Sequence, residues 1–125
     1  MTVEIRKQFR FEAAHVLPDH PGKCARLHGH SYRLDVALAG PLHAGGPARG
    51  MVTDFEEVSA IVRPRVLERL DHSSLNDIIE NPTAERIALW VWAELTDHLP
   101  LLVEVVVWET QTACAVVRGD DARAR

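Results

Sequence analysis

The chain has 125 residues, a length typical of one domain that buries roughly two thirds of its unfolded surface. Its 46% hydrophobic and 26% charged residues are ordinary for a globular protein, and a formal charge of -4 does not suit a general binder of nucleic acid or anionic membranes. No segment has the composition of a signal peptide or a membrane span. We therefore expect a cytoplasmic protein whose two cysteines, Cys24 and Cys114, are reduced thiols.

Two segments near the start of the chain alternate between apolar and polar residues, which predicts half-buried strands. In residues 8–16 the apolar positions share a face with His15. In residues 27–38 they share a face with His28 and His30. The segment between them contains two prolines and a glycine and is predicted to be a loop.

A helix is predicted over residues 53–70, after a second, glycine-rich loop. Asp54 followed by Glu57 has the pattern of a capping box at its start. Its apolar stripe comprises Phe55, Val58, Ile61, Val62 and Leu70. Pro64 lacks the N–H that a helix interior needs, so it should kink or split this helix.

A second helix is predicted to open with Asn81 as its cap and Pro82 in its first turn. Its apolar stripe would be formed by Ile87, Val91 and Leu95, and could extend to Leu99.

Two more strands, residues 101–109 and 113–117, are predicted after the helices, followed by a flexible tail at 119–125. The order of elements is therefore strand, strand, helix, helix, strand, strand. This order predicts a single α+β domain over residues 1–118 with an antiparallel sheet.

The histidines on the first two strands suggest a metal site. Residues two apart on a strand point to the same side about 6.6 Å from each other, so His28 and His30 can reach one ion. If the two strands form a hairpin, His15 lies opposite His28 and can join them. A lone histidine on an apolar face is more often a hydrogen-bonded core residue, but three converging imidazoles favour zinc with an open fourth position. The remaining histidines that we considered, which we expect at the surface, are His20, His43 and His98.

For each of the other reactive side chains, the sequence allows two interpretations. Cys24 could complete a tetrahedral structural site as the fourth ligand, or it could stay off the metal as a base or nucleophile. Asp71 and His72 could form a pair that orients an imidazole for general acid chemistry, or they could be solvated surface residues. Glu109, at the end of an apolar strand, could hold a guanidine-like edge of a ligand or turn into solvent.

Six segments carry a pattern in the order FRFEAAHVL, CARLHGHSY, GMVTDFEEV, LDHSSLN, NPTAE and WETQTACAVV. Together they resemble the 6-pyruvoyl-tetrahydropterin synthase superfamily over nearly the whole chain. Three residues separate Cys24 from His28, a spacing similar to that of the 6-carboxy-5,6,7,8-tetrahydropterin synthases of the 7-deazapurine (queuosine) pathway. The eukaryotic pyruvoyl enzymes place more residues in that gap.

The resemblance implies the tunnelling fold, which has two helices on one face of a four-stranded antiparallel sheet. It also implies a homohexamer in which three subunits close a barrel, two such rings stack, and active sites form between subunits. In the members it resembles, Zn²⁺ is held by residues that match His15, His28 and His30.

The implied reaction converts 7,8-dihydroneopterin triphosphate to 6-carboxy-5,6,7,8-tetrahydropterin, with loss of acetaldehyde and triphosphate. By the same resemblance Cys24 is the catalytic base, Asp71 and His72 relay protons, and Glu109 anchors the pterin. Neighbouring basic residues that could meet the triphosphate are Lys23 and Arg26. Two alternatives stay open, namely 6-pyruvoyl-tetrahydropterin synthase activity on the same substrate and a non-catalytic, zinc-stabilised assembly module.

Overall fold

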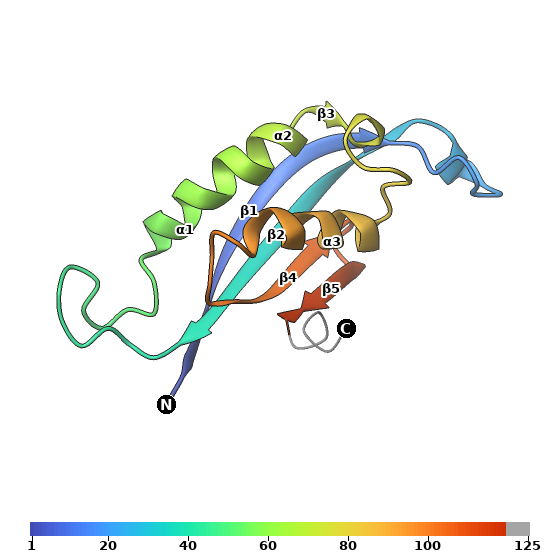
Figure 1. The fold of residues 1–125 in the computed structure, drawn as a ribbon. Coiled ribbons are helices and arrows are strands. Elements are labelled where there is room, and N and C mark those ends of the chain that lie inside the picture. The colour runs from blue at the N-terminus through green and yellow to red at the C-terminus, as the bar shows by residue number, and fades with distance from the viewer. Residues whose placement is uncertain (120–125) are drawn as a thin grey trace.

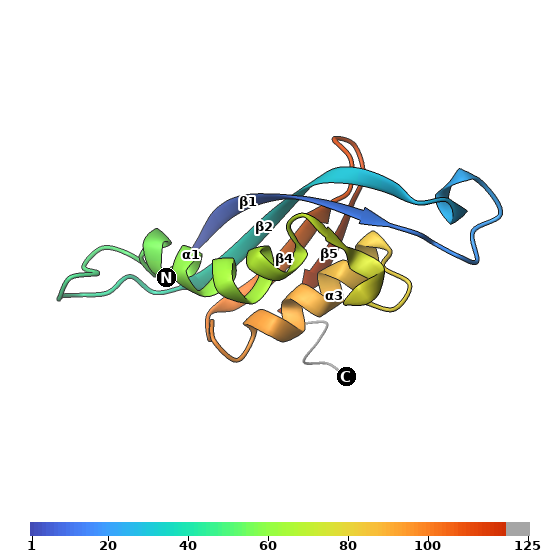
Figure 2. The same cartoon turned by 90° about the horizontal axis from the view of Figure 1, so that it is seen from above.

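The computed structural model describes residues 1–119 and contains one five-stranded sheet in the order β3-β1-β2-β4-β5, with its helices on one side (Figures 1 and 2). The long strands β1 (Val3–His15) and β2 (His28–Gly40) form an antiparallel hairpin. On the other side of β2 lie β4 (Leu102–Trp108) and then the edge strand β5 (Cys114–Arg118), both antiparallel to their neighbours. The predicted α+β fold with four antiparallel strands and helices on one face is therefore confirmed in outline.

The fifth strand was not predicted. β3 (Ser73–Ser74) pairs with β1 in parallel, so the sheet is mixed rather than purely antiparallel. Two serines inside a polar loop carry no alternation of apolar and polar residues, and the pairing depends on where the preceding helix delivers the chain. It is followed by the short 3-10 turn η3 (Leu75–Asp77).

Pro64 splits the first helix as predicted. The α-helix α1 (Phe55–Val62) passes into a π-helical turn, η2 (Arg63–Leu67), and then into the short α2 (Glu68–Leu70). Proline cannot donate to the helical ladder and its ring crowds the carbonyl four residues before it, so the ladder widens locally instead of ending.

The start of α1 agrees only in part with the sequence. Asp54 caps the helix, but its side chain accepts from the backbone N–H of Glu56 at 2.9 Å rather than pairing with Glu57. Phe55 was predicted in the apolar stripe, and this is wrong because its side chain is 49% exposed. It is the first residue of the helix, where the chain has only begun to approach the sheet.

The predicted cap of the second helix is also wrong. The helix α3 (Ala84–Leu95) is capped by Thr83, whose hydroxyl accepts from the backbone N–H of Arg86 at 3.2 Å. Asn81 has φ of +46°, a left-handed conformation, whereas an N-cap residue needs an extended one. The helix itself is as expected, and its stripe of Ile87, Val91 and Leu95 is buried.

The core lies between the helices and the sheet. The largest side chains with almost no exposed surface include Phe11, Tyr32, Leu34, Leu38, Leu70, Leu75, Ile87 and Leu95. The opposite face of the sheet carries no helix (Figure 2). There Asp35 is 6% exposed and is held by Arg33 Nε and Trp108 Nε1, both at 3.3 Å.

The sequence predicts that the domain ends at residue 118 and that the tail spans residues 119–125. Gly119, the first residue of the predicted tail, is buried against the ring of Trp92, and residues 120–125 lie outside the described part of the chain. Between residues 1 and 119, none of the helices combines the length and the apolar character needed to cross a membrane.

Candidate metal centre and active site

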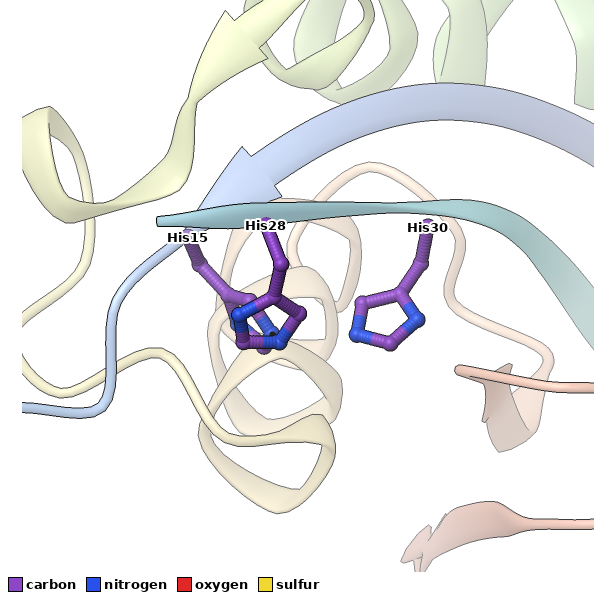
Figure 3. Close-up of side chains that lie close together, drawn as sticks. All are labelled: His15, His28 and His30. Atoms are coloured by element: carbon purple, nitrogen blue, oxygen red, sulfur yellow. Dashed lines mark hydrogen bonds between the residues drawn. The ribbon is translucent and has the colours of Figure 1, made fainter. Parts of the chain in front are cut away.

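Three imidazoles converge on the helix-covered side of the β1–β2 hairpin (Figure 3). His15 ends β1 and pairs in register with His28, which begins β2, and His30 follows two residues later. One ring nitrogen from each residue lies within 4.8 Å of the others, and the Nε2 atoms of His15 and His28 are 3.0 Å apart. The shared strand face predicted from the sequence is therefore the actual arrangement, and His15 is fully buried.

Backbone carbonyl oxygens lie within hydrogen-bond distance of the Nδ1 atoms of two of these rings. The Nδ1 of His15 lies 2.8 Å from the carbonyl oxygen of Pro82, and the Nδ1 of His28 lies 2.7 Å from that of Arg26. A carbonyl can only accept a hydrogen bond, so both rings carry their proton on Nδ1. The lone pairs of both Nε2 atoms consequently face the space between the rings, as in histidines that bind a metal.

His30 completes the group with an unpartnered nitrogen. Its Nε2 is buried and makes no hydrogen bond to any of residues 1–119, although Glu109 Oε1 lies 3.5 Å away. Burial lowers the pKa of His30, and the charge of Glu109 opposes this effect only in part, so the ring is neutral at pH 7. A buried imidazole nitrogen without a partner, beside two other lone pairs, fits a metal ion.

Tyr32 packs next to the centre and was not predicted as a site residue. Its hydroxyl lies 3.4 Å from His15 Nδ1, and its ring stacks on Phe11 with centroids 4.8 Å apart. Burial, with a smaller contribution from the charge of Glu109, raises the pKa of Tyr32, so the phenol remains protonated. Tyr32 lies on the same face of β2 as His28 and His30, and this alternation could have indicated a site residue. The same alternation is also typical of an ordinary core residue.

Glu109 faces a cavity rather than open solvent. It follows β4 at a turn closed by a hydrogen bond from its backbone N–H to the carbonyl of Ala113, at 3.1 Å. The cavity has a volume of about 550 Å³ and lies between α3 and β5. Its apolar lining residues include Ala84, Leu89, Ala115 and Val117. The sequence left the direction of Glu109 open, and the structure brings it to the metal centre.

Asp71 and His72 form the expected pair at the end of α2. Asp71 Oδ1 lies 3.1 Å from His72 Nδ1 and accepts from the backbone N–H of Glu12 at 2.8 Å. The pKa of Asp71 is lowered, chiefly by the hydrogen bond from the Glu12 N–H; desolvation opposes this effect, and His72 lowers the pKa further. His72 has φ of +59°, its side chain is 80% exposed, and it borders an open depression on the surface together with His30.

The loop before β2 contributes a main-chain group to the site. Cys24 lies in the 3-10 turn η1 (Lys23–Ala25), is half-buried, and does not belong to the group of converging ligand atoms. No hydrogen bond or ion pair in residues 1–119 connects the side chains of Lys23 or Arg26 to the site, and Arg26 contributes its carbonyl instead. The turn is stabilised by a hydrogen bond of 2.9 Å from the backbone N–H of Leu17 to the carbonyl of Cys24.

Asn76 is a second residue that the sequence did not single out. Its side-chain amide accepts from the backbone N–H of Val16 and donates to the Val16 carbonyl, both at 2.8 Å. This two-point contact fixes the chain immediately after His15. An asparagine in a polar loop gives no sequence signal for such a contact, because its partner is 60 residues away.

Comparison with known proteins assigns the chain to a family. Residues 4–120 match the family described as 6-pyruvoyl tetrahydropterin synthase. A Synechocystis protein named 6-carboxy-5,6,7,8-tetrahydropterin synthase is 49% identical over 115 residues, covering 89% of each chain. A Pyrococcus furiosus protein named dihydroneopterin monophosphate aldolase is 34% identical, covering 87% of this chain and 91% of its own. The structure of Caenorhabditis elegans 6-pyruvoyl tetrahydropterin synthase matches with a TM-score of 0.83 at 26% identity, covering 95% of this chain and 96% of its own. The chain therefore belongs to the 6-pyruvoyl tetrahydropterin synthase family.

Proposed function

We propose that the protein is a zinc-dependent 6-carboxy-5,6,7,8-tetrahydropterin synthase. It would convert 7,8-dihydroneopterin triphosphate and one water molecule to 6-carboxy-5,6,7,8-tetrahydropterin, acetaldehyde and triphosphate. The observation that carries this proposal is the convergence of three imidazole nitrogens beside Glu109, in a chain 49% identical to a protein of that name.

The metal would be held by the Nε2 atoms of His15, His28 and His30. Neutral imidazoles suit Zn²⁺, whereas Mg²⁺ or Ca²⁺ would want an oxygen-rich set. When bound, zinc supplies a Lewis acid that stabilises negative charge developing on substrate oxygens. The carbonyls behind His15 and His28 support this assignment, because they keep the ligand nitrogens unprotonated without adding charge.

Glu109 would orient the pterin. A carboxylate has two acceptor oxygens and can receive hydrogen bonds from the exocyclic amino group and a ring N–H of the pterin at once. The adjoining cavity of about 550 Å³ is large enough for a bicyclic ligand and is mostly apolar, as such sites usually are. The 3.5 Å separation of Glu109 from His30 would then put the pterin side chain next to the metal centre.

Proton transfer would involve Cys24 on one side and the Asp71–His72 pair on the other. Cys24, a free thiol close in sequence to His28, would take the side-chain proton of the substrate. The lowered pKa of Asp71 keeps it ionised, so it can orient the His72 imidazole, which borders the same surface depression as His30. Lys23 and Arg26, on the same loop as Cys24, would meet the triphosphate.

We further infer a cytoplasmic homohexamer, built as a dimer of trimers with active sites between subunits. The free thiols of Cys24 and Cys114 suit a reducing compartment. The strand β5 lies at the edge of the sheet and the face opposite the helices is uncovered by any element of residues 1–119. Closing three sheets into a barrel removes such edges.

Product analysis tests the proposal. Purified, zinc-loaded protein is incubated with 7,8-dihydroneopterin triphosphate, and both acetaldehyde and the pterin product are measured. We expect acetaldehyde and 6-carboxy-5,6,7,8-tetrahydropterin in equal amounts. The second candidate, 6-pyruvoyl-tetrahydropterin synthase activity, is favoured by the similarity to the C. elegans structure and would release triphosphate without acetaldehyde. Formation of the pyruvoyl product, or no turnover at all, would overturn the proposal.

A further inference from the structure

The carbonyl that holds His15 comes from the residue just before the cap of α3. The first ladder bond of this helix joins the N–H of Ile87 to the carbonyl of Thr83, at 2.9 Å. The carbonyl of Pro82 precedes that bond and stays outside the helical ladder. It accepts from Nδ1–H of His15 at 2.8 Å in a buried position 67 residues away in the chain.

A three-residue turn sets the direction of this carbonyl. The N–H of Thr83 donates to the carbonyl of Asn81 at 2.8 Å, which closes a γ-turn centred on Pro82. Proline has φ fixed near −65°, close to the value that an inverse γ-turn needs at its centre. Asn81 enters the turn with φ of +46°, and the Pro82 side chain is buried. The γ-turn hydrogen bond and the fixed φ of Pro82 therefore both restrain the carbonyl that accepts the hydrogen bond from His15.

We propose that the turn Asn81–Thr83 is a positioning element for the metal centre, and that Asn81 acts in it through its left-handed backbone. The left-handed backbone of Asn81 orients Pro82, whose carbonyl keeps the His15 proton on Nδ1. The Nε2 lone pair of His15 is thereby directed toward His28 and His30. This inference rests on the proposed metal centre, and it gives a role to the NPT segment beyond starting a helix. His28 is held independently by the carbonyl of Arg26.

The side chain of residue 81 decides how easily the turn forms. In the left-handed region a β-carbon crowds the backbone and disfavours most residues, while glycine has no such penalty and asparagine only a reduced one. An alanine at this position should drive the turn toward an extended conformation and move the Pro82 carbonyl away from His15. A glycine should preserve it.

Two measurements test the proposal. In metal-free wild-type protein at pH 8, ¹⁵N NMR of the histidine rings should show the His15 proton on Nδ1. Zinc affinity, measured by competition with a chromophoric chelator, should fall about tenfold to a hundredfold in Asn81→Ala, the usual effect of losing a partner of a metal-bound histidine. Asn81→Gly should bind zinc like the wild type, as should the control Glu80→Ala, which changes an exposed neighbour. The melting temperature of each metal-free variant is recorded alongside.

The outcomes separate this inference from the proposed function. If the wild type binds no zinc, the metal centre itself is wrong. If the wild type binds zinc but its His15 proton sits on Nε2, the role of the turn is overturned, whether or not the variants fold. Wild-type affinity in Asn81→Ala, or equal loss in the alanine and glycine variants, would overturn it as well.

Discussion

At the residue scale, each histidine of the proposed metal centre would contribute a single ligand nitrogen, so removing one would leave two. We expect His28→Ala to lose zinc and activity together, because two imidazoles and water hold Zn²⁺ far less tightly than three imidazoles. Elemental analysis and turnover on the same preparation check this. His20→Ala, which alters an exposed loop histidine, should retain both. Full zinc occupancy in His28→Ala would show that the ligand set is wrong.

Cys24 should separate chemistry from metal binding. Cys24→Ala removes the proposed base and leaves all three imidazoles, so zinc content and substrate affinity should stay near wild type while turnover falls about a hundredfold or more. Cys24→Ser should be similarly slow, because a hydroxyl is a much weaker acid than a thiol. Zinc content, substrate binding and turnover are measured together. Loss of zinc along with activity would instead make Cys24 a ligand.

Asp71 should make stability depend on pH in a defined direction. The Glu12 N–H and His72 lower its pKa in the folded protein, relative to about 3.9 in an unfolded chain. The resulting stabilisation is present above the unfolded value and is lost as pH falls through the lower folded value. Asp71→Asn should therefore melt below the wild type at pH 7, and the gap should close progressively below about pH 4. Melting curves from pH 3 to 7 check this, and a gap independent of pH would contradict it.

The convergence of the three histidines could be predicted from the sequence, because strand parity and hairpin register are local patterns. His15, His28 and His30 needed only a period of two and one loop. The partners behind them could not be predicted, because they are main-chain atoms or distant side chains. The Pro82 carbonyl and the Asn76 amide reach β1 from 60 or more residues away, and neither residue type signals such a contact.

At the scale of elements, Thr83 should account for a measurable part of the stability of α3. Its hydroxyl satisfies the N–H of Arg86, so Thr83→Ala should lower the free energy of unfolding by about 1 kcal/mol. Thr83→Ser keeps a capping hydroxyl and should lose much less. Chemical denaturation of both variants provides the measurement. If serine costs as much as alanine, the cap is not the cause.

Some helices and strands follow from local sequence patterns, whereas others depend on tertiary contacts. The break at Pro64 was predictable because the missing N–H acts within its own helix. The cap at Asn81 was predicted wrongly because Asn-Pro followed by an apolar stripe also fits a turn placed before the helix, and the left-handed Asn81 selects the turn. The strand β3 has only two residues and forms through tertiary placement, so no sequence period could reveal it.

At the scale of the whole molecule, the exposed edge at β5 and the helix-free face suggest that the chain does not act alone. We expect light scattering to give about six times the subunit mass of 14.0 kDa at micromolar concentration. A fully active monomer under these conditions would contradict the hexamer and the placing of active sites between subunits.

The proposed function requires that three histidines hold a catalytic zinc ion while Cys24 remains off the metal. Zinc-edge X-ray absorption on the active, zinc-loaded protein tests it most directly, because zinc–sulfur bonds of about 2.3 Å are distinct from zinc–nitrogen bonds of about 2.1 Å. Our account predicts a first coordination sphere of nitrogen and oxygen atoms only, with three imidazoles. A sulfur atom in that sphere would make Cys24 the fourth ligand of a closed structural site, and the proposed mechanism would be wrong.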